Sequence, residues 1–382
     1  MSRFSLAARA LILGGALLAT GFFVGLGFQS RATEQARSAP KTQPTATPAP
    51  APLVKGLRSS PDGRLLAFTG IYNNYGRGSL WVVDLQTKRA RATASPVGWQ
   101  DYVAAWRDDG RALLLEREKI PRPAAKAKAG VYSAPVDGAS LSTGEPENLT
   151  PKLPRGEKIV SGLYAPDGTL VLKTRSDPKT LFRVEGTGET ARAVPIDHAA
   201  VTYGQNRAVK VGNRTIYYVM RDIAKQPDKV ALFRVENAQA RQISPAWDES
   251  EIVWSYVSPS GKQLLLARYE GESDWQWTLY NIEANAVKKI KTAIVPGDVI
   301  TVYWSPDEKQ IVGAAGEKLW LISIPDLKTT QLGNRTDWSA DDVTWIGDQK
   351  AIAVAAGGEL WRVAVPGGQT EKVWRFPNEY WK

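Results

Sequence analysis

The sequence predicts an all-β protein, a seven-bladed β-propeller preceded by one N-terminal transmembrane helix. Three observations predict the propeller: a strand-type hexamer that recurs, a turn that recurs between strands, and apolar runs that are nearly continuous. Each hexamer opens with an aliphatic and an aromatic residue, and the seven copies begin at Leu80, Val131, Leu181, Leu232, Leu279, Leu319 and Leu360. A period of about 40–50 residues built from β-type segments indicates a repeat architecture.

Each copy contains four predicted antiparallel strands. An approach strand, which often ends in an aromatic residue such as Trp106, Trp304 or Trp345, leads into a turn. An apolar strand, the hexamer strand and a fourth strand follow. Because the apolar strands do not alternate strictly, we expect both faces of each sheet to be buried, as happens when sheets stack around an axis. The turn of the fourth copy, 211–215, is weak, so six or eight blades stay open as alternatives.

The recurring turn is clearest in Ser60-Pro61-Asp62-Gly63. Proline presets φ, aspartate binds the local backbone, and glycine takes a left-handed conformation. We therefore interpret the equivalent aspartates as turn residues, one in each of several blades, rather than as paired catalytic carboxylates: Asp62, Asp109, Asp167 and Asp307. In the sixth copy Glu308 stands where glycine is expected.

The N-terminal part of the chain predicts a signal anchor over residues 1–30. Its segment 10–28 carries no charge and, as a helix, is nearly long enough to cross a bilayer. Cleavage near Ser30-Arg31-Ala32 would instead release a secreted form, and this alternative stays open. The chain then divides into a Pro/Ala-rich flexible linker, the propeller and a C-terminal tail, at 31–53, 54–376 and 377–382. We expect the propeller to lie outside the cytoplasm, in the periplasm or at the cell surface.

The composition excludes several classes of site. The chain has no Cys, so disulfides, thiolate nucleophiles, Cys-ligated metals and a lipidated cysteine are excluded. A site built from several histidines is excluded as well, because His198 is the single histidine. The net charge of +10 is spread thinly along the chain, which argues against a nucleic-acid partner. We expect no cofactor and no metal.

Two segments, "SPDGRLLAFTGIYNNYGRGSLWVVDLQTKRARAT" (60–93) and "WSPDEKQIVGAAGEKLWLISIPDLKTTQL" (304–332), resemble the TolB-type, WD40-like propeller repeat. The resemblance covers about residues 54–376 and implies the fold more than the function. TolB carries a further domain before its propeller, where this chain has the predicted anchor and linker. Propeller-containing peptidases add a hydrolase domain, and this chain has no Gly-x-Ser-x-Gly motif.

The connections between blades predict a ligand-binding face. Each connection carries an acidic residue shortly before an aromatic strand, and together they supply Trp99, Asp101, Trp247, Asp248, Asp298, Trp338 and Asp341. A ring of carboxylates and indoles around a central mouth would suit a basic peptide, a cation or a sugar. The alternative is that these residues cap the starts of strands and pack between them.

We expect a non-enzymatic, membrane-anchored propeller that acts as a scaffold for a protein or cell-envelope partner. This expectation rests on the repeats, the tether and the missing hydrolase and metal motifs. The alternative is a carbohydrate-active enzyme, a lyase or glycosidase, that uses carboxylates at the channel mouth, for example among Asp101, Asp298 and Asp341.

Overall fold

The computed structural model describes residues 51–377 except 73–76, 121–128, 152, 154–158, 166–167, 175–179, 187–189, 198–206, 212–213, 224–225, 238, 271–273, 293, 295–298, 316, 334–337, 339 and 348. The predicted anchor and most of the predicted linker therefore lie outside the described residues, and the anchor finds no support in the structure. Within the described part, no helix is both long and apolar enough to cross a membrane.

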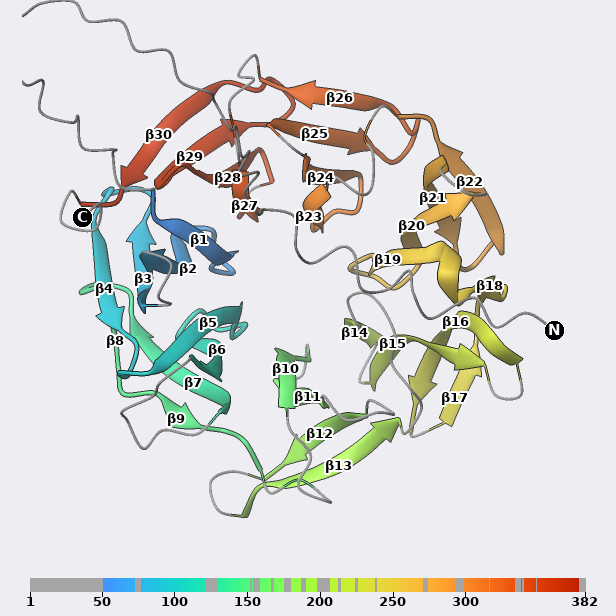
Figure 1. Cartoon of the computed structure of the whole chain (residues 1–382), viewed down its shortest axis with the longest axis horizontal. Coiled ribbons are helices and arrows are strands. Elements are labelled where there is room, and N and C mark those ends of the chain that lie inside the picture. Colours follow the sequence, from blue (N-terminus) through green and yellow to red (C-terminus); the bar gives the residue numbers. More distant parts are fainter. Residues whose placement is uncertain are drawn as a thin grey trace, which may run out of the picture. The chain divides into compact units, whose positions relative to one another are not determined.

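Seven antiparallel sheets follow one another along the chain and stand around a central axis (Figure 1). The first three sheets comprise β1 (Leu53–Ser59), β2 (Leu65–Tyr72), β3 (Arg77–Asp84) and β4 (Ala90–Ala94); β5 (Trp99–Trp106), β6 (Ala112–Lys119), β7 (Gly130–Asp137), β8 (Ser142–Thr143) and β9 (Glu147–Asn148); and β10 (Ile159–Tyr164), β11 (Leu170–Thr174), β12 (Leu181–Glu185) and β13 (Arg192–Asp197).

The other four sheets complete the ring. They comprise β14 (Arg207–Val211), β15 (Arg214–Ile223), β16 (Gln226–Glu236), β17 (Gln239–Gln242) and β18 (Trp247–Asp248); β19 (Ile252–Val257), β20 (Gln263–Glu270), β21 (Asp274–Asn281) and β22 (Ala286–Ile290); β23 (Val299–Trp304), β24 (Gln310–Ala315), β25 (Lys318–Ser323) and β26 (Thr329–Leu332); and β27 (Ala340–Ile346), β28 (Ala351–Ala356), β29 (Glu359–Ala364) and β30 (Thr370–Arg375). A short 3₁₀ helix, η4 (Glu249–Glu251), precedes β19. The prediction of an all-β, seven-bladed propeller is confirmed.

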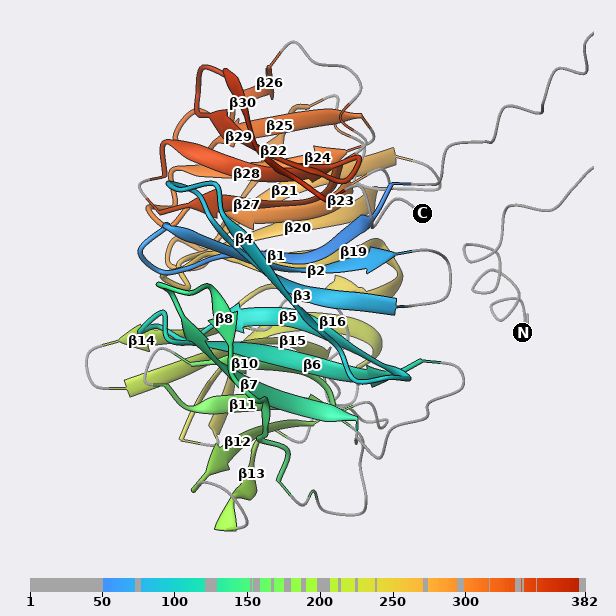
Figure 2. The same ribbon diagram turned by 90° about the vertical axis from the view of Figure 1, so that its left-hand side faces the viewer.

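The first strand of each sheet lies innermost, at β1, β5, β10, β14, β19, β23 and β27, and the later strands lie progressively further out (Figure 1). Figure 2 shows the ring from the side, with the strands running through its thickness. The second strands are buried on both faces: Leu65 to Phe68 of β2 and all six residues of β28 are buried. This burial explains the nearly continuous apolar runs in the sequence.

Tryptophans at the ends of inner strands join neighbouring blades. The indole N–H of Trp106 donates to Arg58 O at 3.1 Å, and Trp304 and Trp345 each donate at 3.0 Å to Tyr256 O and Tyr303 O. In all three cases the acceptor lies on the inner strand of the preceding blade. The tryptophans that recur before the turns therefore donate hydrogen bonds from one blade to the preceding blade.

We expect Trp345→Phe to lower the free energy of unfolding by about 1–2 kcal/mol, because Tyr303 O loses its donor and the smaller ring leaves a void. Urea denaturation measures this change. Trp254→Phe is the matched control, because Trp254 is 45% exposed and should tolerate the same exchange. Equal losses at the two positions would contradict the role given to Trp345.

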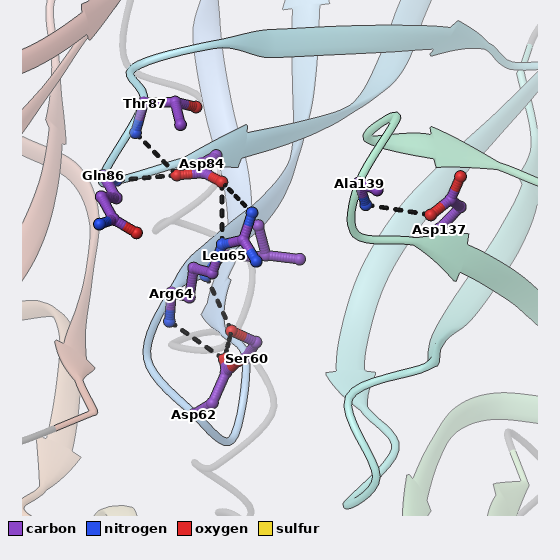
Figure 3. Close-up of polar contacts among 9 residues, drawn as sticks. All are labelled: Ser60, Asp62, Arg64, Leu65, Asp84, Gln86, Thr87, Asp137 and Ala139. Carbon is purple, nitrogen blue, oxygen red and sulfur yellow. Dashed lines mark hydrogen bonds and ion pairs between the residues drawn. The ribbon is translucent and has the colours of Figure 1, made fainter.

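The turns have the hydrogen bonds that the sequence predicts. In the first blade, Asp62 Oδ1 accepts from Ser60 Oγ at 2.5 Å and from Arg64 N at 3.1 Å (Figure 3). Asp307 repeats the pattern with Ser305 and Lys309 at 2.7 and 3.2 Å, and Asp109 accepts from Arg111 N at 2.9 Å. These aspartates are turn residues; Asp167 lies outside the described residues.

Among the described strands, the first sheet consists of β1–β4 and the last of β27–β30, so these two sheets close the ring without exchanging a strand. An aromatic group, which we call the closure cluster, joins the two sheets and consists of Phe68, Tyr72, Trp81, Trp374 and Phe376. Phe376 is 1% exposed, and its ring centroid lies 5.4 Å from that of Trp81 and 5.9 Å from that of Phe68. The residues just after β30 therefore complete the core beside β2 and β3.

Candidate functional site

A cavity of about 390 Å³ lies among the inner strands of the ring. Residues from the first, second, third and sixth sheets line it, so it belongs to the central channel rather than to one blade. Its polar lining residues are Arg58 of β1, Glu116 of β6, Ser161 of β10, Lys173 of β11 and Tyr303 of β23. We call this group the channel cluster.

Arg58 is held in one orientation. Its Nε donates to Ala104 O at 2.9 Å, and its Nη1 donates to Leu57 O at 2.8 Å and to Tyr303 Oη at 2.6 Å. Among the described residues, Nη2 has no acceptor within hydrogen-bond distance, while the side chain is 29% exposed. A fixed guanidinium with an open edge in a cavity is suited to bind a carboxylate or another anion.

The position of Arg58 depends on a bulge in β1. The register of β1 and β2 shifts between Lys55 and Arg58, and Gly56 has a φ of +65°. A β-carbon at Gly56 would lie 2.3 Å from Val103 O, so only glycine fits against the next blade. Asp342 of β27 accepts from Leu57 N at 2.8 Å and lies 3.8 Å from Arg58 Nη1. The buried Asp342 therefore fixes the bulge that carries Arg58.

Two titratable groups share the cavity with Arg58. Burial raises the pKa of Glu116, although Gly162 N, which donates to its carboxylate at 3.1 Å, and the charge of Arg58 oppose the shift. Burial also raises the pKa of Tyr303, again against the effect of Arg58. Burial lowers the pKa of Arg58. The charges and hydrogen bond of Tyr303, Asp342 and Glu116 together raise it by more, so the pKa of Arg58 is above its ordinary value. The cavity thus combines a permanent cation with a phenol that keeps its proton and a carboxyl group suited to proton transfer.

Asp341 should make the stability of the folded protein depend on pH. Burial raises the pKa of Asp341 to about 6, Val54 N opposes this shift by donating at 3.2 Å, and the neighbouring Asp342 adds to it. The folded protein therefore binds a proton more tightly than the unfolded chain does, so stability falls as pH rises from about 4 to about 6. The loss is on the order of 1–3 kcal/mol for this half-buried group.

We expect Asp341→Asn to be more stable than the native protein at pH 7 and equally stable below pH 4. Thermal denaturation across this pH range provides the measurement. Burial raises the pKa of Asp342 as well, so the variant keeps part of the dependence. A variant that is destabilised equally at every pH would contradict this account.

The residues predicted for the ligand-binding face occupy several separate places. Trp99 and Asp101 are buried in β5, where Asp101 pairs with Arg117 of β6 at 2.5 and 2.8 Å. Trp247 is buried in β18 with its ring against Tyr280, and Asp248 pairs with Lys229 at 2.8 Å.

The remaining predicted residues lie in or before the last sheet, apart from one. Trp338 is 1% exposed and its ring meets that of Trp361 edge-on. Asp341 lies on β27 beside the bulge of β1. Asp298 lies outside the described residues. Asp341 is therefore the predicted residue that the structure links to the neighbourhood of the channel cluster.

The channel cluster itself was not predicted, although the differences between copies contain its signal. Aligned on the turns and the strand pairing, Arg58 occupies the place of Ala105, Leu163, Tyr256, Tyr303 and Thr344, and Glu116 occupies the place of Thr69, Lys173, Ala267, Ala314 and Ala355. Arg58 is charged where these five copies are neutral, and Glu116 and Lys173, which both line the cavity, are charged where four other copies are neutral. The likeness of the copies predicts the fold, and these charged exceptions indicate the cavity.

The described residues do not fit a metal ion. No group of three or more His, Asp or Glu side chains lies close enough to hold one in the part of the chain that the structure describes. The lone His198 lies outside that part.

Comparison with known proteins shows the fold. No protein-family model and no curated protein match this chain. Similar solved structures include an oligogalacturonate lyase in complex with manganese (TM-score 0.57, 16% identity, 87% of this chain and 91% of that one) and a puromycin hydrolase (0.56, 13%, 84% and 53%). The β-propeller domain of the trilobed protease from Pyrococcus furiosus, described as having an open velcro topology, is also similar (0.54, 13%, 86% and 100%).

These comparisons correct one expectation. The expectation that the chain is not an enzyme is contradicted, because an oligogalacturonate lyase and a puromycin hydrolase are among the solved structures that are similar to it. The absence of a hydrolase motif and of a second histidine in the sequence excludes particular reaction types. It does not exclude enzymes as a class. At 13–16% identity the likeness shows the fold and no particular activity.

Proposed function

We propose that this propeller is a carbohydrate-active enzyme that binds an acidic oligosaccharide in its central channel and cleaves it by β-elimination. The observation that carries the proposal is Arg58, which lines the cavity, is held by Ala104 O, Leu57 O and Tyr303 Oη, and has no acceptor for Nη2 among the described residues. Such a guanidinium is suited to the carboxylate of a uronate unit. The fold is shared with an oligogalacturonate lyase, which supports this class of reaction.

The channel cluster contains groups for each part of the reaction. Arg58 would bind the uronate carboxylate and acidify the proton on the neighbouring ring carbon. Glu116 would accept that proton, since its raised pKa makes it a better base than an exposed carboxylate. Tyr303 would protonate the departing glycosidic oxygen, because its raised pKa keeps the phenol neutral. The C–H and C–O bonds break, and a double bond forms between the two ring carbons.

The test is incubation of the purified protein with acidic and neutral oligosaccharides, followed by ultraviolet absorbance for unsaturated products. We expect product from the acidic sugars. Arg58→Ala should weaken binding roughly 10–100-fold, whereas Arg58→Lys should retain part of it. Glu116→Gln should bind normally and react far more slowly. The matched control is Arg183→Ala, whose exposed side chain pairs with Glu185 far out on β12. An active Glu116→Gln, or no product from any acidic sugar, would refute the proposal.

We also propose that the chain acts outside the cytoplasm, held by the apolar segment 10–28, where it would meet envelope polysaccharides or a protein partner. The likeness of its repeats to the TolB-type repeat supports this location. A topology reporter fused after Lys382 tests it: activity of a periplasmic reporter supports the proposal, and activity of a cytoplasmic reporter contradicts it.

A further inference from the structure

Lys173 is a basic residue of the cavity wall to which the proposed reaction assigns no role. It lies on β11, is half-buried, and stands opposite Ser161 of β10 and Leu181 of β12 in the ladder. All three residues line the cavity. Leu181 belongs to the same apolar cluster as Val219 and Val235 of the fourth sheet. Because opposite residues of a ladder share a face, Lys173 lies on the face of the third sheet that is turned toward the fourth blade.

Glu116, at the equivalent position of the second blade, reaches the cavity from the other side of the third sheet. It stands opposite Val131 of β7, and Val131 belongs to the same apolar cluster as Phe182 of β12. Its carboxylate accepts from Gly162 N of β10 at 3.1 Å. The inner strand β10 therefore lies between Glu116 and Lys173, and the cavity borders both of them.

Packing between blades does not account for a lysine at this position. Four other copies carry a small, neutral and fully buried residue there: Thr69, Ala267, Ala314 and Ala355. Moving an ammonium group out of water into such a contact is unfavourable. The stem of Lys173 can pack beside β10 while its ammonium group stays at the cavity, where the charge is available to a bound anion.

We propose that Lys173 binds the carboxylate of a second uronate unit while Arg58 binds that of the first, so that the channel selects substrates with two carboxylates. The inference rests on the function proposed for the channel cluster, and it adds a residue that determines substrate specificity. A ligand held by Arg58 and Glu116 must extend past β10 to meet Lys173. The cavity, at about 390 Å³, is within the range of pockets that hold drug-sized ligands.

The two cations are suited to different parts of such a ligand. Arg58 is a planar fork fixed by three acceptors, so it binds a carboxylate in one orientation. A lysine ammonium group is a point charge on a flexible stem, so it tolerates variation in where a linked sugar unit places its carboxylate. We therefore expect Arg58 to position the reacting unit and Lys173 to add affinity for its neighbour.

The experiment is calorimetric titration of the full-length protein with galacturonate and with digalacturonate, which serve as the probes. The native protein should bind digalacturonate more tightly than galacturonate. Lys173→Gln should bind digalacturonate about tenfold more weakly and galacturonate unchanged, because only the second carboxylate loses its cation. Lys173→Arg should retain most of the affinity for digalacturonate. Arg58→Ala should lose affinity for both probes.

Lys288→Gln is the matched control, because it removes the same charge from an exposed lysine on β22, the outermost strand of the fifth sheet. Lys173→Met, which keeps an unbranched stem, should repeat the loss seen with Lys173→Gln. If Lys173→Gln and the native protein bind digalacturonate equally, the role of Lys173 is overturned and the proposed function stands. An equal loss for both probes also overturns that role. If the native protein binds neither probe, both proposals are overturned.

Discussion

Asp342→Ala is expected to lower the free energy of unfolding by about 3 kcal/mol or more. The side chain of Asp342 is buried, and its two oxygens accept from Leu57 N and Val343 N, each at 2.8 Å. Alanine leaves the buried N–H of Leu57 without an acceptor and removes the anion nearest to Arg58. Because Leu57 lies on the first sheet and Asp342 on the last, the substitution removes a contact that closes the ring.

Chemical denaturation measures this loss, and the Asp342→Asn variant provides an intermediate case. The amide keeps one acceptor oxygen, so we expect a smaller loss than for alanine. Asp137→Ala is the matched control: Asp137 accepts from Ala139 N at 3.0 Å in an exposed turn (Figure 3), and its replacement should leave the midpoint unchanged. If Asp342→Ala were as stable as the native protein, the account of ring closure would be wrong.

Phe376→Ala is expected to lower the free energy of unfolding by about 3–5 kcal/mol, because the ring is buried and its removal leaves a cavity. The side chain fills the space between Trp81 of the first sheet and Trp374 of the last, with ring centroids 5.4 and 4.7 Å away. Without a shared strand, the closure cluster is a main apolar contact between the two ends of the domain. We also expect faster limited proteolysis near these ends.

The contrast with Phe376→Leu separates cavity formation from a specific aromatic effect. Leucine keeps most of the buried area, so it should cost about a third of the alanine value. Val287→Ala serves as the control, because Val287 is a 48% exposed apolar residue on β22. Losses that are equally small for alanine and leucine would show that Phe376 does not hold the ring together.

The fold could be predicted because its information is local and repeated. Turn chemistry at Ser60-Pro61-Asp62-Gly63 and the aliphatic–aromatic hexamers occur at a regular period, and each copy forms a four-stranded sheet, to which the second and fourth add a short fifth strand. The manner of closure was not predictable in this way. Phe376 is the last residue of the predicted propeller, and only the ring brings it to Trp81, far away in sequence.

The candidate site was harder to predict because channels are assembled from single residues of different blades. Loop acids such as Asp101 attract attention in the sequence, yet Asp101 is held in a buried ion pair with Arg117. Arg58 and Glu116 lie inside strands that otherwise look structural, and they come together only when the first and second blades meet around the axis. Their charge at positions that are neutral in most of the other copies was the available signal.

The most direct test is a crystal structure of the Glu116→Gln variant, which keeps Arg58, in complex with an acidic oligosaccharide. We predict sugar density in the central channel, with a carboxylate within hydrogen-bond distance of Arg58 Nη2 and close to Tyr303. Sugar bound only on the outer strands, or an empty channel at a saturating concentration of a sugar that the native protein cleaves, would contradict the account.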